Sequence, residues 1–512
     1  MLFNSIEFLV LFLPFVVLGC LCLNKLSILL NFNKKFYYHL FLIFVSFVFY
    51  SFFSIKYLFL LIFSILVNFF ISYCLEKKKS FILLIFGIIF NLSIILYYKY
   101  LNFILINLGL EAQNFNSNFN FDYVFIPLAI SFYTFQQIGY LVDIYKGNTK
   151  IPKVFEYFVF VSFFPQLIAG PILRGSYFFP QLQKTPDLKF DKIEIGLCIF
   201  FIGLFKKVCI ADQLGKIVNP IFFDVENGKS IDFITSWVGG IAYSLQLYFD
   251  FSSYSEMAVG LGIILGFTLP LNFNSPYKQT NIIQFWRNWH ITLHNFFKEY
   301  VYIPLGGSKN SLLTTVILTN FVFLIGGLWH GAGWNFIVWG LYNGILVSCN
   351  LLIKYCLDFQ FIKKNFFVYF LKRLFLLIFL VVGWIFFRSS TLDVASTFLG
   401  KMFDLKLFYK IFLDFYADQN FILNLEILKQ YCDLESIILI LLSAFIVLFL
   451  PNWHDIFLKK EDQQFKNYNL IKLNYFNNQR NQFVCKTLCV LLFLISFYNL
   501  SDSPKEFIYF QF

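Results

Sequence analysis

Long apolar runs separated by short polar segments dominate the chain. About 20 consecutive apolar residues cross the roughly 30 Å hydrocarbon core of a bilayer as a helix. The pattern therefore predicts an all-α, polytopic integral membrane protein, with about 11 to 14 membrane helices at that length. The runs expected to span are 8–24, 37–54, 57–75, 81–98, 122–141, 154–171, 193–211, 231–249, 311–328, 334–353, 367–387, 437–450 and 485–500.

Three further segments depart from the simple spanning pattern. Residues 100–110 and 254–270 are shorter or rich in glycine, which favours re-entrant or interfacial elements. Residues 282–302 interleave apolar and polar side chains at helical spacing and run into Pro304. That spacing predicts one amphipathic helix, placed at the membrane interface or against a water-filled cavity.

Composition supports a membrane protein and excludes other classes. The 512 residues are 59% hydrophobic and 13% charged, whereas a soluble domain carries roughly 25% charged residues. The net charge of +11 is expected to lie in cytoplasmic loops beside anionic membrane lipid. Because the basic residues are scattered among apolar runs, we expect no nucleic-acid binding. One membrane-embedded domain is expected over 1–512, with a core over 1–400 and further helices and a cytoplasmic loop over 401–512.

Lysine and arginine placement predicts the orientation, since cytoplasmic loops carry an excess of both. Three lysines fill 77–79, whereas 100–121 has neither lysine nor arginine. Strict alternation of the spans then places the N-terminus outside and 77–79 in the cytoplasm. The loop 455–486 carries six basic residues and is also expected in the cytoplasm.

His330 is the first candidate for chemistry. It lies between two long apolar runs, with glycines at 326, 327, 331 and 333. An ionisable group at membrane depth is costly and therefore suggests a function. A neutral imidazole there can accept a proton from a hydroxyl. The residues alone leave a second interpretation equally open, namely a structural histidine hydrogen-bonded between helices.

His290 and His294 are four residues apart, so they are expected on one helical face. A zinc protease would require Glu after the first histidine, but position 291 is Ile. No CxxC pair occurs among the ten cysteines, so we expect no metal and no tightly bound cofactor. We expect His290, Trp286 and Arg287 to line a polar pocket and His294 to face the interface.

Asp250 to Glu256 ends another apolar run with two carboxylates and three serines in close succession. This composition suggests a cavity wall or re-entrant turn that includes Asp250 and Ser252, with a hydrated loop as the alternative. Ser252 lacks the Gly-x-Ser-x-Gly setting of a hydrolase nucleophile.

Taken together, these segments resemble the membrane-bound O-acyltransferase family, in its bacterial polysaccharide O-acetyltransferase branch of alginate and peptidoglycan type. The matching segments occur in family order over residues 1 to 400, and Ser253 stands where the family usually has Gly. The segments are Phe3-Asn4-Ser5, 126–135, 164–172, 248–255, 285–293, 302–307, 327–331 and 384–388.

The resemblance implies a central tunnel with His330 as the catalytic histidine and His290 in a supporting role. It also implies an acetyl-CoA-like donor reached from the cytoplasm, in a bacterial inner membrane. Relatives work with a separate periplasmic O-acetyltransferase of the SGNH type that delivers the group to a polysaccharide. We expect substrate contacts from Trp286, Arg287, Trp329, Trp334, Asp250 and Ser252.

Three other functions are compatible with parts of the pattern. A transporter or flippase would also have many helices and intramembrane polar residues, but the Trp-His-Gly segment has no second copy. A lipid-modifying acyltransferase of the same family would take a membrane-soluble acceptor. A non-catalytic scaffold would leave the intramembrane His330 without a role.

Overall fold

The structure is a computed structural model in which all regular secondary structure of the described residues is helical. The predicted all-α class is therefore confirmed. The structure describes the whole chain except residues 30–32, 110–125, 185, 187, 310, 357–365, 405, 407–408, 410–427, 458–478, 502–504 and 509–512.

Six helices within the described ranges are long and apolar enough to cross a membrane, so the protein is polytopic. Each overlaps one of the predicted runs. Phe81–Asn107 also takes in residues 100–107, so the separate re-entrant or interfacial element expected at 100–110 is instead a continuation of that helix. Other predicted spans, such as 437–450, form helices too short to qualify by the same length. The six are Phe8–Leu26, Ile55–Lys77, Phe81–Asn107, Leu312–His330, Trp334–Cys356 and Phe367–Arg388.

Two predicted segments differ from the structure. The run 154–171 is broken into α7 (Val154–Ser162) and α8 (Phe164–Leu167), because Pro165 clashes with a continued preceding turn. The suspected turn after residue 249 is instead the interior of one 32-residue helix, α12 (Phe233–Ile264). A helix satisfies its own backbone hydrogen bonds, so polar side chains such as Asp250 need only side-chain partners.

The chain packs into two compact units, whose segments alternate along the sequence. Unit 1 comprises Met1–Phe205, Ser253–Asn272 and Trp453–Phe512, and unit 2 comprises Lys206–Ser252 and Phe273–Asn452. The single membrane domain expected from the sequence stays a prediction.

Unit 1 holds most of the N-terminal helices, and polar side chains join some of them. In α3 and α4, the amides of Asn68 and Asn91 donate to each other, with N···O distances of 3.1 and 2.6 Å. Such amide pairs hold membrane helices together, because both groups avoid apolar lipid. The main helices are α1 (Leu13–Leu29), α2 (Lys34–Ser51), α3 (Ile55–Lys77), α4 (Phe81–Ile95), α6 (Ile130–Lys146), α10 (Phe190–Phe205) and α23 (Gln479–Tyr498).

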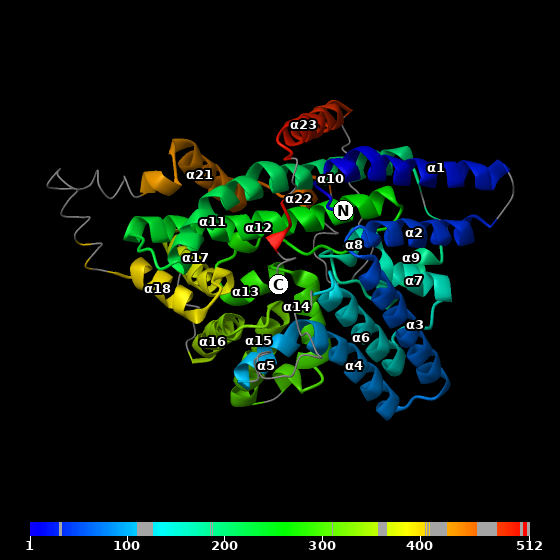
Figure 1. Cartoon of the computed structure of the whole chain (residues 1–512), viewed down its shortest axis with the longest axis horizontal. Coiled ribbons are helices and arrows are strands. Elements are labelled where there is room, and N and C mark those ends of the chain that lie inside the picture. Colours follow the sequence, from blue (N-terminus) through cyan, green and yellow to red (C-terminus); the bar gives the residue numbers. More distant parts are fainter. Residues whose placement is uncertain are drawn as a thin grey trace, which may run out of the picture. The chain divides into compact units, whose positions relative to one another are not determined.

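Unit 2 holds His290, His294 and His330 among four helices, α13 to α16, whose ribbons run from green to olive in Figure 1. Helix α15 packs lengthwise against α16, and the contact depends on small residues. A Cβ added to Gly327 would lie 2.2 Å from the backbone oxygen of Phe336, and one on Gly340 would lie 2.5 Å from that of Phe323. Glycine therefore lets these two backbones touch. The four are α13 (Ile282–Asn288), α14 (Ile291–Phe297), α15 (Leu312–His330) and α16 (Trp334–Cys356).

Candidate active site

An interruption of the helical structure at His290 shapes the site. The single helix predicted over 282–302 is wrong, since α13 ends at Asn288 and α14 begins at Ile291. Between them His290 adopts a left-handed conformation, with φ of 44° and ψ of 55°. Such a backbone costs roughly 1–2 kcal/mol for a residue with a side chain, and conformations of this kind concentrate at functional sites.

His330 is the last residue of α15 and is buried, with 6% of its surface exposed. Aromatic rings surround it. The centroid of its imidazole lies 4.8 Å from that of Trp329, 5.0 Å from Trp339 and 5.0 Å from Phe387, all close to edge-on. These contacts fix the plane of the imidazole in an apolar surrounding.

Trp329 connects the two histidines of the site. Its ring centroid lies 6.0 Å from that of His290, in addition to the contact with His330. The other face of His290 is covered by Phe251, whose ring centroid is 4.8 Å away. His290 is therefore held by packing within unit 2, one indole away from His330.

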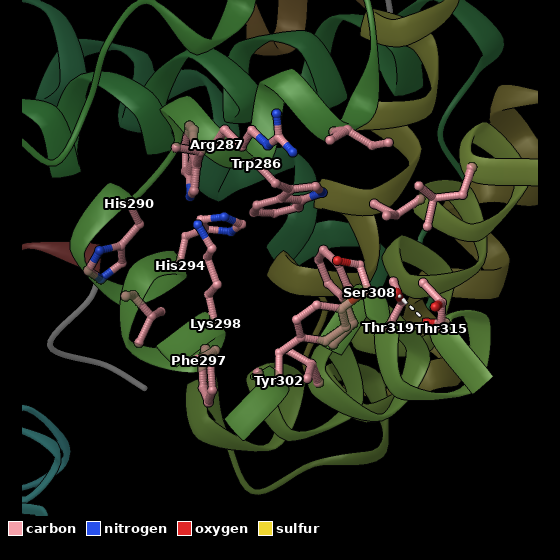
Figure 2. A pocket seen from close by; sticks show the side chains of 18 of the residues that line it. Trp286, Arg287, His290, His294, Phe297, Lys298, Tyr302, Ser308, Thr315 and Thr319 are labelled. Atoms are coloured by element: carbon pink, nitrogen blue, oxygen red, sulfur yellow. Dashed lines mark hydrogen bonds between the residues drawn. The ribbon is translucent and has the colours of Figure 1, made fainter. Parts of the chain in front are cut away.

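A cavity of about 380 Å³ opens beside both histidines, between α13, α14, α15 and α16. In Figure 2, His294 and Lys298 lie on one side of it and Thr315 and Thr319 on the other. Its wall consists of Ile283, Trp286, Arg287, Trp289, His290, Leu293, His294, Phe297, Lys298, Tyr302, Ser308, Thr315, Thr319, Val322, Phe323, Gly326, His330, Trp339, Val347 and Leu351.

The cavity is elongated, because one face of α15 lines it from end to end. Thr315, Thr319, Val322, Gly326 and His330 are spaced by three or four residues, which places them on a single helical face. Fifteen residues of α-helix rise about 22 Å. A ligand that filled this length would extend along α15 and reach His330.

The end of the cavity away from His330 is polar. Burial raises the pKa of Tyr302, while hydrogen bonds with Thr319 and Thr315 counteract that effect, so the three hydroxyls lie close together. Two exposed cations, Arg287 and Lys298, also belong to the wall. Hydroxyls and cations of this kind suit phosphate or another anionic group.

His290, between α13 and α14, and His294, in α14, lie outside the six candidate spans and are neutral at pH 7. Burial lowers the pKa of His290 to about 3. Burial also lowers the pKa of His294 to about 4, and the positive charges of Lys298 and Arg287 lower it further. Neither imidazole therefore adds a cation to the cavity.

The structure brings together four of the eight predicted site residues: Trp286, Arg287, His290 and His330. Trp329 lies just outside the wall, because a step of one residue along α15 turns its side chain about 100° away from that of His330. Trp334 begins α16 and is 54% exposed. Trp329 and Trp334 therefore do not belong to the wall of this cavity, and their expected contacts with substrate stay a prediction.

Asp250 and Ser252 are also absent from the cavity wall, because they are buried inside α12. The Nζ of Lys207 lies 2.7 Å from Asp250 Oδ1 and 2.9 Å from Asp212 Oδ1. The carboxylate of Asp250 thus compensates a buried lysine, and the expected substrate contacts of Asp250 and Ser252 stay a prediction.

Sequence reasoning missed other residues of the wall. His294 was expected to face the interface, yet it lines the cavity, because the break at His290 reorients α14. Thr315 and Thr319 could have been found by their helical spacing from His330. In the part of the chain that the structure describes, no group of three His, Cys, Asp or Glu side chains is arranged to hold a metal ion.

The buried His330 and the cavity beside it lie in a chain of apolar helices that matches a family of membrane acyltransferases. The chain belongs to the membrane-bound O-acyltransferase family, whose model matches residues 145–390. It is an O-acyltransferase and a multi-pass membrane protein.

Several relatives are named for the polymer they act on. The chain is 40% identical to the peptidoglycan O-acetyltransferase of Helicobacter pylori, over 78% of this chain and 80% of the relative. It is 35% identical to the "probable alginate O-acetylase AlgI" of Azotobacter vinelandii, over 79% of this chain and 78% of the relative. A teichoic acid D-alanyltransferase of Bacillus subtilis is 30% identical over 46% of this chain and 62% of its own length.

Proposed function

We propose that this enzyme transfers an acetyl group from a cytoplasmic acyl-CoA-type thioester, across the membrane, toward hydroxyls of a cell-envelope polysaccharide. The observation that carries the proposal is the placement of His330, which is buried among aromatic rings at one end of a long cavity. The names of the relatives support acetyl as the group and peptidoglycan or an exopolysaccharide as the polymer.

His330 acts as a general base in this proposal. Its imidazole takes the proton of the acceptor hydroxyl while the hydroxyl oxygen attacks the carbonyl carbon of the thioester. The tetrahedral intermediate collapses, the carbon–sulfur bond breaks and an ester forms. The departing thiolate receives the proton from the imidazolium, so the histidine returns to its neutral state. No acyl-enzyme intermediate is involved.

The elongated cavity suits a donor whose reacting end is far from its charged end. The thioester lies beside His330, and the donor's arm runs along α15 past Val322 and Thr319. Arg287 and Lys298 supply positive charge for a phosphate of the donor. The donor is a substrate, and the proposal includes no tightly bound cofactor.

The cellular setting follows from the acceptor. The enzyme lies in a bacterial inner membrane, and an exported SGNH-type O-acetyltransferase completes delivery to the polysaccharide outside. The arrangement lets the acetyl group cross the bilayer while the donor stays on the cytoplasmic side.

The test compares the cell envelope with and without the gene. Deletion is expected to remove O-acetyl groups from peptidoglycan or from an exopolysaccharide, measured as acetate released by mild base. The wild-type gene restores the signal, and a His330→Ala gene expressed to the same level does not. Unchanged acetate in every polysaccharide fraction, with a change in membrane lipids instead, contradicts the proposed acceptor.

A further inference from the structure

Gly326 lies one helical turn before His330 on the same face of α15, and both residues line the cavity. A Cβ built on Gly326 meets only one atom, Cε2 of Phe297, at the ordinary contact distance of 3.8 Å. The missing side chain therefore leaves open space next to the histidine.

The neighbouring glycines differ in this respect. A Cβ on Gly327 would collide with the backbone of α16 at 2.2 Å, and one on Gly331 with the ring of Phe336 at 2.1 Å. A Cβ on Gly333 would lie 2.4 Å from Oδ1 of Asn335. Those three glycines permit close packing, whereas helix packing gives no reason for glycine at position 326.

We propose that Gly326 is a specificity-determining residue that leaves a passage for the donor's arm, so that its thioester reaches His330. The inference rests on the proposed thioester donor. The cavity runs along α15 from Thr315 to His330, and any ligand filling that length must cross Gly326. A side chain at this position enters the passage because no packed neighbour displaces it.

The test measures binding of coenzyme A to the full-length protein in detergent, by calorimetry, in addition to thiol release from acetyl-CoA. Gly326→Ala, Gly326→Val and Gly326→Leu form a size series. Gly400 in α18 (Leu392–Met402) provides the matched control, because a Cβ there meets nothing within 4 Å and Gly400 is not part of the cavity wall. Gly400→Leu makes the same helical substitution away from the passage.

Gly326→Leu is expected to weaken coenzyme A binding by about tenfold or more, since a leucine side chain occupies the open space that the donor's arm needs and each factor of ten corresponds to about 1.4 kcal/mol. Gly326→Ala is expected to lose less, and thiol release should fall in the same order. The melting temperature should stay at or above the wild-type value, as it should for Gly400→Leu.

His330→Ala separates this inference from the proposed function. It is expected to bind coenzyme A as the wild type does but to release no thiol. If His330→Ala turns over normally, the proposed function fails, while the Gly326 series still tests the passage. If Gly326→Leu binds and reacts like the wild type, the passage is elsewhere and the inference is overturned. Absence of coenzyme A binding in the wild type contradicts both.

Discussion

The indole of Trp329 packs nearly edge-on against the imidazole of His330, with ring centroids 4.8 Å apart and planes inclined by 75°. The same indole contacts His290. Trp329 does not belong to the cavity wall, so we expect it to act as a positioning residue that holds His330 in place.

Trp329→Phe keeps a ring beside His330, whereas Trp329→Ala leaves space into which the imidazole can turn. We expect Trp329→Ala to lose acetyl transfer and about 3–5 kcal/mol of stability, the usual cost of removing a buried tryptophan. Trp329→Phe should retain most of both. The pH profile of thiol release distinguishes positioning from folding alone, because a displaced imidazole changes its apparent pKa. Identical profiles for the residual activity of Trp329→Ala and the wild type contradict the positioning role.

The buried pair Lys207–Asp250 is expected to matter for folding rather than chemistry. Asp250→Ala removes the nearer of two carboxylates beside Lys207, while Asp212 stays, and breaking a buried pair costs about 3–5 kcal/mol. Removing both charges with Lys207→Met and Asp250→Leu should recover part of that loss. Thermal unfolding in detergent measures both effects. An Asp250→Ala protein with the wild-type melting temperature but no activity places Asp250 at the reaction instead.

A substitution at Gly331 tests whether this glycine serves helix packing or leaves space for a ligand. The glycines around His330 suggest an acyl channel, but a side chain at position 331 meets the ring of Phe336. Gly331→Val is therefore expected to cost about 1–3 kcal/mol, and its melting temperature and activity should fall together. If Gly331→Val has normal stability but transfers no acetyl group, Gly331 lines the channel and the packing role is contradicted.

Cysteine labelling tests the orientation. Introduced cysteines at 77–79 and 459–460 should react only from the cytoplasm, and those at 110–118 only from outside, because basic residues concentrate in cytoplasmic loops. Positions 110–118 and 459–460 lie outside the described residues. Labelling of position 114 from the cytoplasm alone inverts the predicted topology.

The sequence predicts the helical class well, because apolar run length is a strong local signal. The importance of the histidine segments stays a prediction. His330 and Trp286 lie where the pattern and the family resemblance suggest. Residue patterns do not reveal which glycine packs and which opens a cavity, since that depends on a neighbouring helix. The left-handed turn at His290 is equally hidden, because nothing in its own side chain requires it.

Asp250 is a second case in which the local sequence does not predict the structure. Clustered polar residues at the end of an apolar run suggest a turn, and the pairing that permits a continuous helix comes from Lys207, more than forty positions earlier. Charge compensation over that separation cannot be inferred from a local window.

The central claim is that His330 is the general base. The most direct measurement is thiol release from acetyl-CoA by the purified full-length protein with acceptor present, comparing wild type, His330→Asn and His294→Asn. We expect His330→Asn to lose about 10²–10⁴-fold in rate, the usual contribution of a general base, with coenzyme A binding and melting temperature unchanged. His294→Asn, which alters the cavity wall but not the base, should lose far less. Equal losses at both positions, or a normal rate in His330→Asn, contradict the claim.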